Sequence, residues 1–237
     1  MSDEMKPRAP SGRLAGANLL TRARARVLRE TAAALLGDTY VLRGSRAVAA
    51  GEPKKIALTF DDGPDRMTPR YIELLDRLSV RATFFLVGYN SELLPETVRA
   101  LVAAGHEVAS HGYTHRPFPT LSPRELVDEL IRSTDCLPPA ATRRPLVRPP
   151  RGATSAASLL RVAAAGYTTL MWSVDSDDCR TTDPRKVEAR VHPKKLGAGD
   201  IVLMHEGQEW TLEALPAIVS RLRGAGFDFA PVSEILG

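Results

Sequence analysis

The feature that most constrains this sequence is a regular alternation of short and long segments from Lys54 to the C-terminus. Short apolar runs rich in β-branched and aromatic residues predict strands, and longer segments with helical periodicity lie between them. A repeated strand-helix-strand order requires parallel strands joined by right-handed crossovers. We therefore expect an α/β fold, which could be an open doubly wound sheet or a barrel.

The pattern predicts seven strands and six helices. Helix starts have local signals as well: Ser122, Pro123 and Glu125 form a capping box that predicts a helix from residue 123. The expected strands are 56–60, 82–86, 107–110, 146–148, 168–172, 201–204 and 227–230, and the expected helices are 68–78, 94–104, 123–135, 155–165, 184–191 and 211–224.

Residues 1–53 differ from the rest and are expected to form an N-terminal arm, with the catalytic domain at 54–237. Residues 1–13 have the composition of a disordered segment, and residues 14–36 predict one amphipathic helix with interleaved arginines. Residues 1–55 hold 11 Lys and Arg against 5 Asp and Glu, a net charge of +6. We interpret this basic helical extension as packing on the body or on a partner.

The composition excludes several classes of protein. Residues 56–237 hold 21 Lys and Arg against 23 Asp and Glu, a net charge of −2, so no nucleic-acid surface is expected. No apolar run approaches the ~20 residues of a membrane span, and no secretory signal is recognised, which favours a cytoplasmic protein. Two cysteines are too few for a disulfide framework.

Polar residues follow five of the expected strands. They are Asp61 and Asp62, His111 and His115, residues 148–152, residues 175–178, and His205. In parallel α/β folds the carboxyl ends of the strands meet at one face, where ligands bind. The five groups are therefore expected to converge on one pocket, which favours an enzyme.

Three of these residues predict a metal site. Two adjacent Asp side chains on a strand point to opposite faces, unless the strand ends between them, and Gly63-Pro64 supplies a turn. His111 and His115 are four apart, a spacing that brings both rings to one side of a helix or a tight loop. Each signal alone is also common in turns, cores and surfaces. Two His and one Asp together leave a coordination position open, as in catalytic zinc sites.

At this point the residues resemble a known family, the polysaccharide deacetylases (NodB-homology domain, carbohydrate esterase family 4). The similarity covers about residues 54–237 and five motifs in order. The motifs are Thr59-Phe60-Asp61-Asp62-Gly63-Pro64, His111-Gly112-Tyr113-Thr114-His115, Arg148-Pro149-Pro150-Arg151-Gly152, Asp175-Ser176-Asp177-Asp178 and Leu203-Met204-His205.

The resemblance implies a distorted parallel (β/α) barrel, often of seven strands, that removes acetyl groups from N-acetylated sugars with one divalent metal ion, usually Zn²⁺, with Co²⁺ as an alternative. Asp62, His111 and His115 would be the metal ligands. Asp61 would be the general base and His205 the general acid. Arg148 and Asp178 would set the protonation of these two. The substrate-binding positions would be Arg151 through its backbone N–H, Pro150, and Leu203 as a wall of the acetyl pocket.

Three positions depart from the family pattern. Gly112 replaces a Ser or Thr whose hydroxyl would hydrogen-bond within the metal loop. Arg151 replaces an aromatic residue, and Cys179 replaces a Trp. We interpret Cys179 as a small pocket-lining residue. Because a guanidinium pairs with carboxylate or phosphate, Arg151 suggests an anionic or carrier-linked amino sugar as substrate.

Three other functions are consistent with parts of the sequence. One is hydrolysis of a different small amide or imide on the same fold. Another is a catalytically inactive carbohydrate-binding relative, although a pure binder needs no base, acid and metal ligands together. The last is a scaffold that holds an acidic partner through its basic arm.

Overall fold

Strand β2 (Lys54–Asp61) lies inside the sheet and shows how the fold is organised. Its first two residues are exposed lysines, and the next six are buried, as in a strand covered on both faces. Ile56 and Leu58 pack on one face and Ala57 on the other, because side chains alternate along a strand. Asp61, the last residue of β2, is on the same side as Ala57 and so faces the interior of the curled sheet.

The computed structural model describes residues 31, 34–45, 51–140, 142 and 144–236. All pairs of named strands are parallel, in the order β1-β6-β5-β4-β3-β2-β8-β7, and β9 pairs with the start of β2. The other strands are β1 (Tyr40–Val41), β3 (Thr83–Leu86), β4 (Glu107–Ser110), β5 (Leu146–Val147), β6 (Thr168–Leu170), β7 (Val174–Asp175), β8 (Ile201–His205) and β9 (Phe227–Phe229). The helices are α2 (Thr68–Arg77), α3 (Gly88–Leu93), α4 (Pro95–Ala103), α5 (Pro123–Asp135), α6 (Ala156–Ala164), α7 (Pro184–Arg190), α8 (Glu209–Gly224) and α9 (Val232–Leu236).

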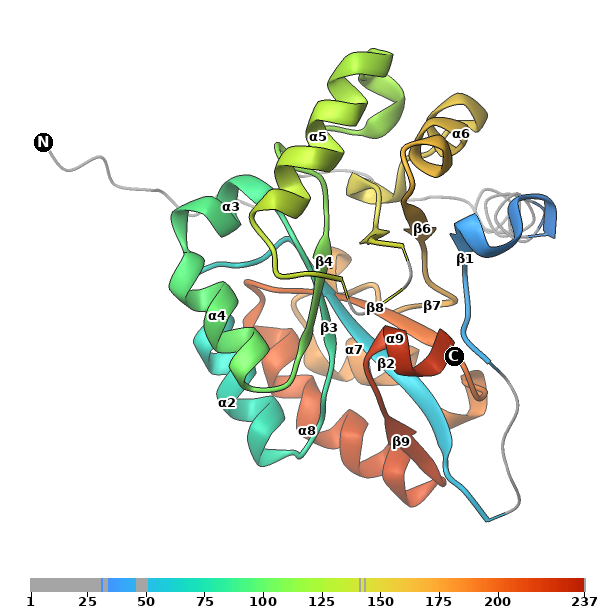
Figure 1. Ribbon diagram of the computed structural model, residues 1–237. Coiled ribbons are helices and arrows are strands. Elements are labelled where there is room, and N and C mark those ends of the chain that lie inside the picture. Colours follow the sequence, from blue (N-terminus) through green and yellow to red (C-terminus); the bar gives the residue numbers. More distant parts are fainter. Residues whose placement is uncertain (1–30, 32–33, 46–50, 141, 143, 237) are drawn as a thin grey trace, which may run out of the picture.

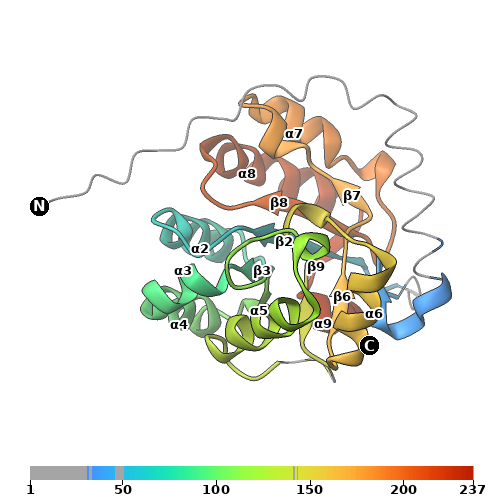
Figure 2. The ribbon, with the colours of Figure 1, turned by 90° about the horizontal axis from the view of Figure 1, so that it is seen from above.

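The arrangement confirms the distorted parallel (β/α) barrel. Seen from above, helices surround the strands (Figure 2), and α2, α4 and α8 group along one side of the sheet (Figure 1). The expected number of seven strands is wrong, because eight strands follow one another in the sheet order and β9 lies beside β2. The strands that the sequence missed, β1 and β7, have two residues each, too few to show any periodicity.

Two of the apolar clusters cover the two faces of the sheet around β2. The larger core lies between the sheet and the outer helices and includes Phe60, Tyr71 and Leu215. The smaller core lies on the other face, where Val232 and Ile235 of the C-terminal helix α9 pack with Ala57. Helix α9 therefore covers apolar residues on the inner face of the curled sheet.

Part of the N-terminal region also contacts the sheet. Of the helix expected over residues 14–36, only residue 31 and residues 34–36 are described, and they are helical. Strand β1 pairs with β6, and Arg43 Nε lies 3.0 Å from Asp200 Oδ1. The boundary between residues 53 and 54 stays a prediction, and residues on its N-terminal side belong to the sheet. None of the helices in the described ranges has the length and hydropathy of a membrane span.

Candidate metal centre and active site

Asp61 and Asp62 face the same site because β2 ends between them. Asp61 is the last residue of the strand, and Asp62 has a left-handed backbone with φ 77°. Asp61 Oδ2 lies 3.7 Å and Asp62 Oδ1 lies 3.4 Å from Nε2 of His111. The turn expected at Gly63-Pro64 therefore brings both carboxylates to one side.

His111 and His115 are on a tight loop after β4. Their ring centroids are 5.0 Å apart, and Nε2 of His115 is 3.1 Å from Asp62 Oδ1. Burial tends to raise the pKa of Asp62, but hydrogen bonds with His111 and His115, together with electrostatic interactions with His111 and His205, lower this pKa well below its ordinary value. The structure thus brings the three expected metal ligands together.

The loop of the two histidines depends on Gly112, whose φ is 75°. A Cβ added there would lie 3.3 Å from the ring of Phe118 and 3.4 Å from Glu129 Oε2, in a backbone conformation that strains other residues. The hydroxyl expected at position 112 has a counterpart in Ser110, whose Oγ accepts a hydrogen bond of 3.1 Å from the Gly112 N–H. The glycine therefore suits this loop.

Glu129 on α5 also shapes the loop, and it was not among the residues predicted from the sequence. Its Oε2 accepts hydrogen bonds from the backbone N–H groups of Tyr113, at 2.7 Å, and Thr114, at 2.8 Å, and its Oε1 accepts one from the Thr114 hydroxyl. The feature that could have identified Glu129 is its position, because it is an acid on the buried, apolar side of α5, together with Leu126 and Leu130. The capping box expected at Ser122 is confirmed and starts this helix.

Arg148 connects Asp61 to the loop of the two histidines. Its fully buried guanidinium donates to Asp61 Oδ1 at 2.7 Å and to the hydroxyl of Thr59 at 2.8 Å. Its carbonyl oxygen lies 2.8 Å from Nδ1 of His111, which orients that ring with Nε2 toward the carboxylates. Burial lowers the pKa of Arg148, and the charge and hydrogen bond of Asp61 oppose this change. The two buried charges thus compensate each other.

His205 and Asp178 form a second pair of titratable groups near Asp61. His205 is aligned with Asp61 in the register of β2 and β8, and its Nδ1 is 2.7 Å from Asp178 Oδ1. Asp178 Oδ2 accepts from the His205 N–H at 2.8 Å and from the Thr211 hydroxyl at 2.9 Å. Burial alone lowers the pKa of His205, but the hydrogen bond and charge of Asp178, with smaller contributions from Asp61 and Asp62, raise it to about 9. His205 is therefore held as an imidazolium at neutral pH.

The expected substrate-binding residues lie on two separate elements, β8 and the 3-10 helix Pro150–Gly152. Leu203 is buried on β8, and Pro150 borders the histidine loop, with its Cγ 3.4 Å from the Cβ position of Gly112. Arg151 follows with a left-handed φ of 59° and an exposed side chain. Their contacts with a substrate remain predictions.

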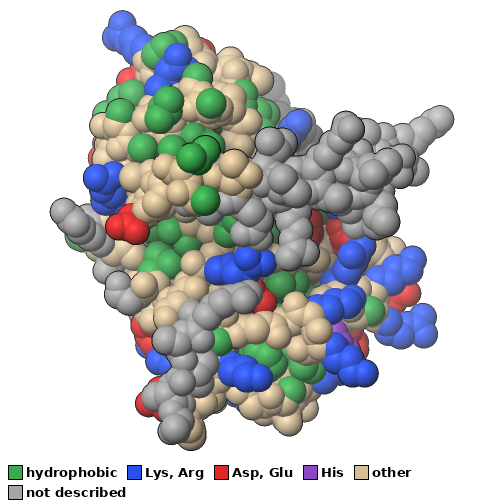
Figure 3. Space-filling view, turned by 90° about the vertical axis from the view of Figure 1, so that its right-hand side faces the viewer, with side chains coloured by type: hydrophobic (Ala, Val, Ile, Leu, Met, Phe, Trp, Pro, Cys, Tyr) green, Lys and Arg blue, Asp and Glu red, His purple; other side chains and the backbone are tan. Residues whose placement is uncertain are grey.

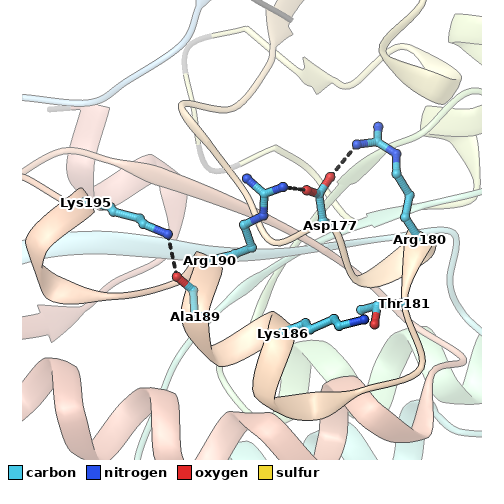
Figure 4. A pocket seen from close by; sticks show the side chains of 7 residues that line it. All are labelled: Asp177, Arg180, Thr181, Lys186, Ala189, Arg190 and Lys195. Atoms are coloured by element: carbon cyan, nitrogen blue, oxygen red, sulfur yellow. Dashed lines mark hydrogen bonds and ion pairs between the residues drawn. The ribbon is translucent and has the colours of Figure 1, made fainter. Parts of the chain in front are cut away.

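A basic pocket lies on the far side of the Asp178 segment, between the 3-10 helix Asp178–Arg180, α7 and the 3-10 helix Pro193–Lys195 (Figure 4). Asp177 points into it and forms ion pairs with Arg180 and Arg190. Lys and Arg side chains also gather at the right-hand side of the face in Figure 3, where α7 and the segment after it lie. The two arginines hold Asp177 on this side, whereas the next residue, Asp178, turns to His205.

The donor set formed by Asp62, His111 and His115 fits one divalent cation. One oxygen or nitrogen atom of each lies within 4.8 Å of the other two. One carboxylate oxygen and two imidazole nitrogens are a ligand combination of catalytic zinc sites, which leave a position for water or substrate. His111 also has the second hydrogen bond that metal-binding imidazoles usually make, here to the Arg148 carbonyl.

Comparison with known proteins agrees with the motifs. The polysaccharide deacetylase family model matches residues 49–170. A peptidoglycan-N-acetylglucosamine deacetylase of Bacillus cereus is 34% identical over 189 residues, which cover 77% of this chain and 88% of that protein. The peptidoglycan-N-acetylglucosamine deacetylase PgdA of Listeria monocytogenes is 31% identical, and the match covers 78% of this chain but only 39% of that longer protein.

Solved structures show the same fold. A deacetylase solved with its substrate has a TM-score of 0.72 and 31% identity, over 80% of this chain and 94% of that one. A CE4 family pseudoenzyme from Bacillus anthracis has a TM-score of 0.74 and 28% identity, over 85% of this chain and 70% of that one. The fold thus occurs in structures described as active deacetylases and as pseudoenzymes, so the site residues must be considered individually.

Proposed function

Because the chain belongs to the polysaccharide deacetylase family, we propose that it hydrolyses the acetamide of an N-acetylated sugar with the help of one bound divalent metal ion. The observation that carries this proposal is the convergence of two separate groups on one face. One is the set Asp62, His111 and His115, and the other is the His205–Asp178 pair, with Asp61 between them in the sheet register.

Asp62, His111 and His115 would hold the cation, with Zn²⁺ the best match to their donor atoms. When bound, such a cation polarises an amide carbonyl and makes a nearby water more acidic. The protein's own contribution is to keep the three donors on one side, through the turn at Asp62 and the loop that Glu129 holds.

Asp61 would act as the general base. Arg148 holds Asp61 Oδ1 at 2.7 Å, which fixes the carboxylate and leaves Oδ2 directed to the metal side, 3.7 Å from His111 Nε2. A carboxylate in this position can take the proton of the attacking water.

His205 would act as the general acid for the departing amine, which must gain a proton to leave. The Asp178 carboxylate keeps the imidazole charged and fixes its ring through Nδ1. The backbone N–H of Arg151 would stabilise the oxyanion, and Leu203 would line the acetyl pocket beside Pro150. The exposed guanidinium of Arg151 would favour an anionic or carrier-linked amino sugar.

The test is acetate release from a panel of N-acetylated sugars, measured with and without a chelator and after the metal is restored. We expect release that stops on chelation and returns with Zn²⁺ or Co²⁺. Release that persists after complete removal of metal would favour hydrolysis of a different amide or imide. Binding to sugars without any release would favour an inactive carbohydrate-binding relative, a role that the CE4 pseudoenzyme makes a concrete alternative.

The substrate preference has its own test. Arg151→Ala should reduce kcat/KM for substrates with a carboxylate or phosphate near the N-acetyl group and leave neutral N-acetylglucosamine oligomers unchanged. The same substitution at Arg77, an exposed arginine on α2, is the matched control. If the unmodified enzyme and both variants hydrolyse neutral oligomers faster than anionic substrates, the proposed preference for an anionic substrate is contradicted. The cytoplasmic location stays a prediction, which fractionation of cells expressing the whole protein would test.

A further inference from the structure

Cys179 lies next to the pair that the reaction is proposed to use as its acid. Its sulfur, one carboxylate oxygen of Asp178 and one ring nitrogen of His205 are all within 4.8 Å of one another. Asp178 and Cys179 are consecutive residues of a 3-10 helix, and His205 is the last residue of β8. Cys179 is therefore not an isolated surface thiol, because two possible ligands from two separate elements lie beside its sulfur.

The three side chains differ in their access to solvent. Asp178 is fully buried and the ring of His205 nearly so, whereas Cys179 is exposed. A small ion can therefore approach from the Cys179 side without any movement of the sheet. A Trp at this position, as in the family pattern, would have no such donor atom and would fill the space.

A thiolate, an imidazole and a carboxylate together are donors that favour Zn²⁺ and the softer Cd²⁺. Atoms bound to one zinc ion are roughly 3.3–3.7 Å apart at ordinary bond lengths, so side-chain rotations alone close the cluster around an ion. Partial burial of the sulfur, with smaller contributions from the carboxylates of Asp178 and Asp175, raises the pKa of the Cys179 thiol to about 11. The same negative charges attract a divalent cation, which then displaces the thiol proton into solvent.

We propose that Asp178, Cys179 and His205 form a second metal site, separate from Asp62, His111 and His115, that takes a soft divalent cation and thereby blocks the acid. A ring nitrogen that binds a metal cannot carry a proton. Occupancy therefore removes the imidazolium form of His205, whichever nitrogen is the ligand. Binding at this site is independent of the proposed deacetylase activity, and only the inhibition rests on it.

The binding test detects a bond between the metal and the sulfur of Cys179, because Asp62, His111 and His115 offer no sulfur ligand. The whole protein, with one equivalent of Zn²⁺ already bound, is titrated with Cd²⁺ while the thiolate-to-cadmium charge-transfer absorption is recorded. We expect a saturable band with one Cd²⁺ per chain, lost in Cys179→Ser and kept in Cys136→Ser, which changes the other, partly buried cysteine. His205→Asn should weaken binding at least tenfold.

Each contrary outcome has a definite meaning. An absorption band that survives in Cys179→Ser overturns the site. A Cd²⁺ affinity that His205→Asn leaves unchanged also overturns it, because the ion would then be bound by the thiol without His205. Acetate release in excess Zn²⁺ is the second measurement: the unmodified enzyme should be inhibited, and Cys179→Ser should resist inhibition relative to its own basal rate. Equal inhibition of both overturns the block. An enzyme without any acetate release contradicts the proposed function but leaves the cadmium titration decisive.

Discussion

The two halves of the proposed active site are held in different ways. Asp62 and His115 lie on left-handed backbone, and their side chains are 46% and 31% exposed. The ring of His205 and the carboxylate of Asp178 are 15% and 0% exposed, and the carboxylate accepts hydrogen bonds from His205 and Thr211. In the metal half, Asp62 and His115 are open to solvent although His111 is buried, whereas the acid half is enclosed.

The difference shows what each half needs. Negative and neutral donors crowd together in the metal half, an arrangement that a bound cation stabilises. The acid half is organised by the protein alone, since Asp178 supplies both the orientation and the charge that His205 requires. Changes in one half should therefore leave the other intact, and the following predictions use that independence.

The largest effect is expected for His111→Ala. The variant loses one of three metal ligands and the ring that connects the carboxylates to the Arg148 carbonyl. We expect less than one metal ion per chain and acetate release at background level, measured by elemental analysis and by an acetate assay. His192→Ala, a histidine outside the site, should keep both. Full metal content with normal activity in His111→Ala would refute the metal centre.

A somewhat smaller effect is expected for His205→Asn. Loss of a general acid typically lowers kcat by ~10²–10⁴-fold, and the ligands of the first metal site, Asp62, His111 and His115, are untouched. Metal content should equal that of the unmodified protein while kcat falls by this factor. A parallel loss of metal would show that the two halves are not independent.

Asp178→Asn should change the pH profile. Activity that needs the His205 imidazolium declines as pH rises through the pKa of about 9. Asn removes the carboxylate charge, so this pKa falls and the alkaline limb of kcat moves to lower pH. Thr211→Val removes an uncharged hydrogen bond to the same carboxylate and should move the limb less. An unmoved limb in Asp178→Asn would exclude His205 as the titrating group.

The smallest effect on activity is expected for Glu206→Gln, which changes the buried residue after His205. Burial raises the pKa of Glu206 to about 8, with small contributions from Asp65, Asp62 and Asp61, although a hydrogen bond from Thr68 opposes the change. Between pH 4.5 and about 8 the folded protein keeps a proton that the unfolded chain has lost, so stability falls as pH rises, by at most ~1.4 kcal/mol per pH unit.

Gln resembles the protonated form and removes this dependence. Denaturant unfolding across the same pH window should give a flatter slope for Glu206→Gln than for the unmodified protein. Glu73→Gln, which changes an exposed carboxyl on α2, should keep the slope. Equal slopes in all three proteins would show that Glu206 is ionised in the folded state.

Much of this organisation could be predicted from the sequence because it depends on local patterns. Apolar runs predicted seven of the strands, and Ser122 with Glu125 predicted the start of α5. Asp61, Asp62, His111, His115 and His205 were predicted to converge because polar residues after parallel strands share one face. The motif spacing identified the family before any contact was known.

Other features could not be predicted because they exist only between elements. Glu129 is an ordinary helix acid until α5 packs beside the histidine loop. Cys179 follows Asp178 in the chain, but it meets His205 only where β8 passes the 3-10 helix.

The sequence by itself determined the alternation of strands and helices, the family and the residue types at the strand ends, because periodicity and motif spacing are written along the chain. Only the tertiary structure decided the strand count, the contact of Glu129 with the histidine loop, and how strongly Asp178 charges His205. Those properties depend on distance and burial between segments far apart in sequence, and no local pattern contains them.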